Sequence, residues 1–244
     1  MYKRLSSGIE SIIIVCSFFI FMLFMIRQCM TYRPQVYAIE SLETRTETNE
    51  NMIDVSLTSV DTILLLGDSI LDNSYYVSPG KSVYDYIKRS IPSSTVIKNL
   101  ARDGAIISEV KTNQLYAIPI TYNKPTTALV LSIGGNDFLS GNAIDLVKPQ
   151  YKDLLQQIRS QFDKSKIYLV DLYRPLDPSL QIYTTIISMW NSYLEQLVKA
   201  NLADAIIPIS NVIVEQTDLV HKIEPSNTGG EKIANLILQT IQTV

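Results

Sequence analysis

Short apolar runs alternate with helical patterns from residue 62 to the end of the printed sequence. The runs predict five strands, at residues 62–66, 95–100, 127–133, 166–172 and 205–209. Two of them, 62–66 and 127–133, are apolar at successive positions. That pattern is typical of strands in a parallel sheet that is covered on both faces.

Apolar residues recur at helical spacing between these strands, which predicts helices around Val147–Phe162 and Ile186–Leu197. A last helix is predicted to begin near Thr228, because Thr228 and Glu231 have the spacing of a capping box. Strand and helix therefore alternate, which predicts an α/β fold: a three-layer α/β/α sandwich with a central parallel five-stranded sheet. In such a fold, ligands bind at the carboxyl ends of the strands.

The N-terminal residues have a different pattern. Residues 5–26 are interrupted by a single charge, Glu10, and at 1.5 Å per residue they would span roughly 33 Å, the thickness of a hydrocarbon core. This predicts an N-terminal transmembrane helix within an anchor at residues 1–30. The residues that follow, Arg27 to Met30, lack a small-x-small cleavage pattern, which favours a retained anchor over the alternative of a cleaved signal peptide. The flanking positive charges are nearly balanced, and we expect the bulk of the chain on the extracytoplasmic side.

Residues 31–61 are acidic and polar with little apolar periodicity, and are predicted to form a solvated stalk. A short helix packed on the following domain is the alternative, because Met52, Ile53, Val55 and Leu57 could find apolar partners there. The folded domain is then residues 62–244.

Composition limits the chemistry of that domain. The net charge of -3 offers no basic surface, so nucleic acid is not expected as a partner. The chain has one histidine, His221, and its two cysteines, Cys16 and Cys29, precede the domain. A site of several histidines or thiolates is therefore excluded there, and no carboxylate cluster suggests a metal. We expect no metal and no cofactor.

Three of the predicted strands are followed by loops rich in glycine and polar residues. Gly67-Asp68-Ser69 follows the first strand, Gly104 lies after the second, and Gly134-Gly135-Asn136-Asp137 follows the third. Each of these loops alone could be an ordinary turn. Together they meet at one edge of the sheet, where glycines let backbone amides approach a ligand and an Asn side chain can donate to an oxyanion.

Asp218 and His221 lie in the loop before the last helix. A separation of three residues across a turn would let the carboxylate reach Nδ1 of the imidazole and leave Nε2 free as a base. An isolated histidine is otherwise more often a surface or structural residue.

These blocks, in this order, resemble those of the SGNH hydrolases, also called the GDSL lipase/esterase family, whose sandwich is flavodoxin-like. The resemblance implies Ser69 as the nucleophile, His221 as the general base and Asp218 as its orienting partner. It also implies an oxyanion hole made by the backbone N–H groups of Ser69 and Gly104 and the side-chain amide of Asn136. The resemblance covers essentially all of residues 62–244, which it implies are an SGNH hydrolase-like catalytic domain.

The chain departs from the family pattern at three places. Ile70-Leu71 follows Ser69, where the family often has a hydroxyl residue. Arg102-Asp103 precedes Gly104 where small residues are more usual. His221 is followed by Lys-Ile-Glu before Pro225, whereas the commoner pattern has proline directly after the histidine.

The resemblance implies a serine esterase that hydrolyses carboxylic esters, acyl or acetyl groups on glycans or lipids, through an acyl-enzyme. Two alternatives stay open: an O-acyltransferase using the same site, and an inactive SGNH-fold binding protein. The expected partners are an ester substrate and, through the N-terminal helix, a membrane.

Overall fold

The computed structural model describes residues 60–244. The predicted anchor at 1–30 and nearly all of the predicted stalk at 31–61 lie outside the described residues. Within residues 60–244, no helix combines the length and the apolar character that a membrane crossing needs.

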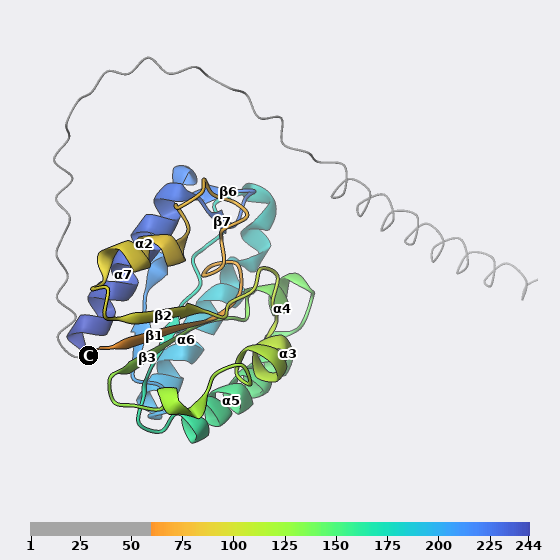
Figure 1. The fold of residues 1–244 in the computed structure, drawn as a ribbon. Helices are drawn as coiled ribbons and strands as arrows, with labels where there is room; N and C mark the ends of the chain where they lie inside the picture. The colour runs from red at the N-terminus through yellow and green to blue at the C-terminus, as the bar shows by residue number, and fades with distance from the viewer. Residues whose placement is uncertain (1–59) are drawn as a thin grey trace, which may run out of the picture. The chain divides into compact units, whose positions relative to one another are not determined.

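The domain is built on one parallel sheet of five strands in the order β2-β1-β3-β4-β5 (Figure 1). The strands are β1 (Thr62–Gly67), β2 (Val96–Asn99), β3 (Thr127–Ser132), β4 (Lys166–Val170) and β5 (Ala205–Ile207). Every neighbouring pair is parallel, so the predicted five-stranded parallel sheet is confirmed. The fifth strand is shorter than predicted, because Pro208 has no N–H to continue the ladder.

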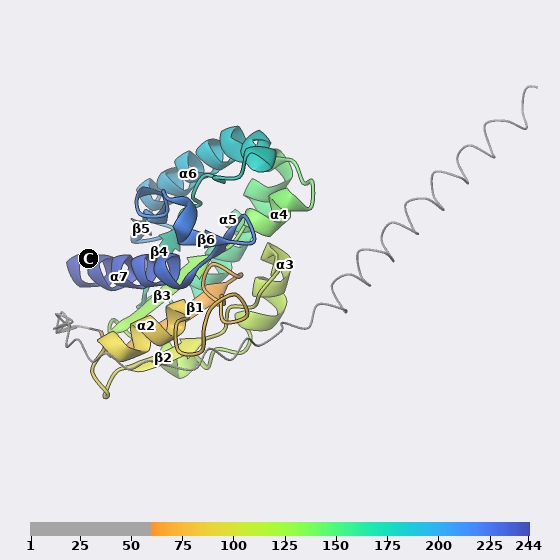
Figure 2. The same cartoon turned by 90° about the horizontal axis from the view of Figure 1, so that it is seen from above.

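The central strands β1 and β3 are buried along their whole length, as expected of strands covered on both faces. The helices α2 (Val83–Ser90) and α7 (Asn227–Thr243) pack together on one face of the sheet, and α5 (Ile144–Gln161) and α6 (Thr184–Lys199) lie on the other (Figures 1 and 2). The architecture is the predicted three-layer α/β/α sandwich.

Shorter elements complete the edge of the sheet where the strands end. They are α3 (Ile107–Glu109), a π-helical turn (Val110–Gln114), α4 (Gly135–Leu139), a 3-10 helix (Pro178–Tyr183) and an antiparallel hairpin of β6 (Leu219–Val220) and β7 (Glu224–Pro225). The hairpin leads directly into α7. That helix begins one residue earlier than predicted and is capped by the Ser226 hydroxyl, which accepts from the Gly229 amide at 3.1 Å.

Candidate functional site

Ser69 lies just beyond the end of β1, in a tightly fixed turn. Gly67 has a φ of +135°, and a Cβ on it would lie 1.7 Å from the Ser132 carbonyl oxygen, so only glycine fits. The buried Gln114 side chain accepts from the Gly67 amide at 2.7 Å and donates to its carbonyl at 2.8 Å. These contacts fix the backbone that presents Ser69.

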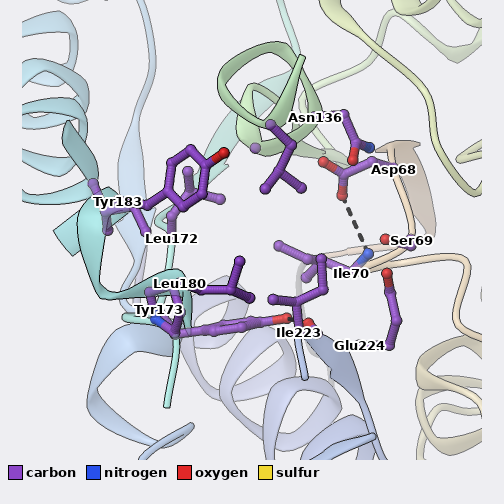
Figure 3. Close-up of a pocket in the computed structure, with 14 residues that line it drawn as sticks. Asp68, Ser69, Ile70, Asn136, Leu172, Tyr173, Leu180, Tyr183, Ile223 and Glu224 are labelled. Atoms are coloured by element: carbon purple, nitrogen blue, oxygen red, sulfur yellow. Dashed lines mark hydrogen bonds between the residues drawn. The ribbon is translucent and has the colours of Figure 1, made fainter. Parts of the chain in front are cut away.

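A pocket opens beside Ser69 at the carboxyl ends of β1, β3 and β4 (Figure 3). It encloses about 590 Å³, including its open mouth. Its polar lining comes from Asp68, Ser69, Asn136 and Glu224, and its walls are mostly apolar. Those apolar walls include Leu139, Leu172, Leu180, Ile187 and Ile223. A serine at the mouth of an apolar cavity suits an ester with an apolar acyl group.

Asn136 lies in the first turn of α4 and reaches the loop that follows β2. Its side-chain nitrogen donates to the Ala105 carbonyl at 3.0 Å, and an amide nitrogen has a second hydrogen to offer. Gly104 precedes Ala105 and has a φ of +73°. Gly104 is exposed and is not among the residues that line the pocket. The structure thus brings Ser69 and Asn136 to one pocket and places Gly104 in the loop that Asn136 contacts.

The Asp218 carboxylate is fully buried and is directed towards its own loop and α7. It accepts from the amides of Val214 at 3.1 Å and Glu215 at 3.0 Å, and its Oδ1 lies 2.7 Å from Lys232 Nζ. Burial opposes ionisation, but the hydrogen bond from Lys232 and those from the two amides keep the pKa of Asp218 below its usual value. Through these contacts the carboxylate holds the loop in place.

His221 is at the exposed tip of the β6–β7 hairpin. His221 and Lys222 adopt left-handed backbone conformations, with φ of +46° and +77°, as a tight hairpin turn requires. The imidazole makes an edge contact with the Tyr76 ring at 5.9 Å between centroids. Among the described residues, no hydrogen bond joins Asp218 to His221, so the structure does not bring this predicted pair together. The reason is the hairpin, which carries His221 outward while the Asp218 carboxylate points inward.

Glu224 is a site residue that the sequence analysis did not select. It lies on β7 and lines the pocket with Ser69. Figure 3 shows its carboxylate turned towards Ser69. Burial raises the pKa of the Glu224 carboxyl, the negative charge of Asp103 adds to the effect, and hydrogen bonding with the Ser69 side chain opposes it. The sequence offered one indication of a role for Glu224: it directly precedes Pro225, and in the commoner family pattern the histidine directly precedes the proline.

Asp68 is a second carboxyl beside Ser69. It is buried, and its Oδ1 accepts from the Ile70 amide at 3.2 Å (Figure 3). The same oxygen accepts from the Ser132 hydroxyl at 3.4 Å. Burial, together with the negative charge of Glu224, raises the pKa of Asp68 to about 7, although the hydrogen bonds from Ile70 and Ser132 act in the opposite direction. Among residues 60–244, no group of three or more His, Cys, Asp or Glu side chains is placed to hold a metal ion.

Residues 63–237 match the family described as GDSL-like lipase/acylhydrolase. The chain belongs to this family. It is therefore an ester-hydrolysing enzyme of the GDSL class, and the resemblance noted from its sequence motifs is confirmed. None of the curated proteins compared with the chain matches it.

Several solved structures share the fold. A lipolytic protein of the G-D-S-L family from Veillonella parvula is 20% identical over 73% of this chain and 96% of its own, with a TM-score of 0.60. The lipase Lip_vut3 from a goat rumen metagenome is 20% identical over 74% and 96%, with a TM-score of 0.59. Phospholipase A1 from Streptomyces albidoflavus is 14% identical over 74% and 98%, with a TM-score of 0.56.

Proposed function

We propose that the protein is a serine carboxylesterase that forms an acyl-enzyme on Ser69 and prefers esters with an apolar acyl group. The observation that carries this proposal is the position of Ser69 at the mouth of a pocket with apolar walls. Attack by Ser69 on the ester carbonyl forms an acyl-enzyme, which water then hydrolyses. The oxyanion is held by the backbone N–H of Ser69, the backbone N–H of Gly104 and the side-chain amide of Asn136.

Of the triad predicted from the sequence, the proposal keeps Ser69 as the nucleophile. His221 as the base, with Asp218 as its orienting partner, stays a prediction. Exchange of His221 and of Asp218, one at a time, tests this prediction against a different base.

The proposal also includes a membrane anchor. Residues 5–26 supply the apolar length for one crossing, and we place the esterase domain on the extracytoplasmic side. Lipid esters and acylated glycans of the cell envelope would then lie within reach of the pocket.

Ser69→Ala in the full chain tests the proposal. We expect the wild type to react with a fluorophosphonate probe and to hydrolyse p-nitrophenyl esters, and the variant to lose the label and at least about 1,000-fold in kcat. Across acetate, butyrate and octanoate esters, kcat/KM of the wild type should rise, by up to about fourfold for each buried CH₂.

Ser160→Ala, which changes an exposed serine on α5, is the matched control and should keep both label and turnover. A wild type that neither takes the label nor hydrolyses any of the three esters would contradict the proposal. Faster release of product in the presence of an added sugar acceptor, with the acyl group recovered on the sugar, would favour the acyltransferase instead.

A further inference from the structure

Ser69 faces a carboxylate where an imidazole was expected. Glu224 and Ser69 line the same pocket, and the glutamate side chain reaches towards the serine (Figure 3). Its Oε2 is buried and has no hydrogen-bond partner among the described residues, so this oxygen is free to accept a proton. His221, in contrast, is exposed at the hairpin tip and does not line the pocket.

The backbone on both sides of Glu224 is held by side chains from the core. The Tyr173 hydroxyl donates to the carbonyl of Ile223, the residue before Glu224. The Asn73 amide donates at 3.2 Å to the carbonyl of Pro225, the residue after it. Asn73 is itself fully buried and accepts from the Val83 amide at 2.9 Å. Glu224 is therefore fixed in front of Ser69 in the way that a positioned base requires.

Two of the departures from the family pattern lie at this site. Asp103, in the loop where small residues are more usual, acts electrostatically on Glu224, which stands directly before Pro225. Tyr76 donates to Asp103 at 2.7 Å and so holds that charge in place. Both changes favour a carboxyl that binds a proton more readily than an ordinary glutamate does.

We propose that Glu224 is the general base for Ser69, so that this enzyme uses a Ser–Glu pair in place of Ser–His. The inference rests on the proposed esterase function. As Ser69 Oγ bonds to the ester carbonyl carbon, its proton passes to the Glu224 carboxylate and the carbonyl electron pair moves to the oxygen. When the tetrahedral intermediate collapses, the bond to the alcohol breaks and Glu224 returns the proton to the departing alkoxide. Water then gives a proton to Glu224, attacks the acyl-enzyme and releases the acid, and Ser69 regains its proton.

The titratable groups around Glu224 predict how the rate of the reaction depends on pH. The titratable groups that interact with it are Asp68 after β1, Tyr76 in the loop before α2, Asp103 after β2 and Tyr173 after β4. Burial and the negative charge of Asp103 raise the pKa of Glu224, and the hydrogen bond with Ser69 only partly offsets them. Activity should therefore rise with pH as this carboxyl ionises, because only the carboxylate accepts the serine proton.

Glu224→Gln and His221→Ala in the full chain test the inference, with p-nitrophenyl butyrate as substrate. A general base typically contributes about 100-fold to 10,000-fold, so we expect kcat of Glu224→Gln to fall by at least about 100-fold while KM changes little. His221→Ala should keep kcat within about threefold. The thermal unfolding midpoint of Glu224→Gln should not fall, because the change removes a carboxyl whose ionisation is costly in this site.

A third variant separates a catalytic role from a structural one. Glu224→His restores the residue that usually precedes the proline, and we expect partial recovery of kcat with the acidic limb of the pH profile moved towards the ordinary imidazole pKa of about 6.5. Full activity in Glu224→Gln, or loss of activity in His221→Ala alone, would overturn the inference and leave Ser69 as the nucleophile. A silent wild type would overturn the proposed esterase function and this inference with it.

Discussion

The buried carboxyl of Asp68, beside the nucleophile Ser69, lowers the stability of the protein at neutral pH. Asp68 is fully buried next to Glu224, and burial raises its pKa to about 7. Between the unfolded value near 3.8 and 7, the folded protein holds a proton on Asp68 that the unfolded chain releases. A group of this kind makes the free energy of unfolding fall as pH rises through that window.

Asp68→Asn tests this cost. The amide keeps an oxygen that accepts from Ile70 and Ser132 but does not ionise. We expect the variant to match the wild type near pH 4 and to exceed it in stability by up to about 4 kcal/mol at pH 8, where the wild-type carboxyl is charged. Thermal unfolding of both full chains between pH 4 and pH 8 measures the difference. Parallel stability curves would contradict the expectation, and the exposed Asp145→Asn is the control.

Residue patterns along the chain predicted some residues of the site and missed others. Ser69 and Asn136 were predicted because glycine-rich turns after buried strands mark the edge of the sheet, and the fold brings both to the pocket. Glu224 was not predicted, because a lone glutamate resembles any surface acid until the fold buries it against a serine. Asp218 and His221 have a favourable spacing, but spacing does not reveal which way each side chain leaves the backbone.

Among the elements, the β6–β7 hairpin determines which residues reach the pocket. Asp218 precedes β6 and ties the hairpin to α7 through Lys232, and a Cβ on Gly229 of α7 would lie 2.0 Å from the Asp218 carbonyl oxygen. The hairpin therefore packs against the start of α7 with no space between their backbones.

Because Asp218 ties the hairpin to α7, Asp218→Ala should lower the stability of the protein. The amides of Val214 and Glu215 would lose their acceptor and Lys232 its buried partner, so we expect a loss of about 2–4 kcal/mol in the free energy of unfolding. His221→Ala, at the exposed tip, should change stability by less than about 0.5 kcal/mol. Urea unfolding of the two variants makes the comparison. A stable Asp218→Ala protein with a collapsed kcat would instead favour the orienting role that the sequence spacing suggested.

Prediction succeeded for the long elements and failed for the short ones, for a physical reason. Strands such as β1 and β3 are buried on both faces, and only continuous apolar runs satisfy that environment. The strands β6 and β7 have two residues each, too few to show any periodicity. Their geometry depends on contacts with Tyr173 and Asn73, which are remote in sequence.

At the scale of the whole molecule, the described domain carries every residue of the proposed chemistry, while residues 1–30 are proposed to decide where it acts. A chain that begins at residue 31 tests whether residues 1–30 determine location without affecting catalysis. We expect the full chain to stay with membranes after alkaline carbonate extraction, because the mostly apolar segment at residues 5–26 is costly to transfer to water. The shortened chain should appear in the soluble fraction with unchanged kcat on p-nitrophenyl butyrate.

Whether the N-terminal segment remains on the mature protein distinguishes a retained membrane anchor from a cleaved signal peptide. Mass spectrometry of the chain made in cells should find the predicted anchor intact, because Arg27 to Met30 offers no cleavage pattern. A mature chain beginning near residue 39, after the small residue Ala38, would identify a cleaved signal peptide and remove the anchor from the proposal. Protease added to intact cells should degrade the domain if it faces outward. Protection until the cells are opened would reverse the orientation, and with it the side of the membrane on which an ester substrate must be sought.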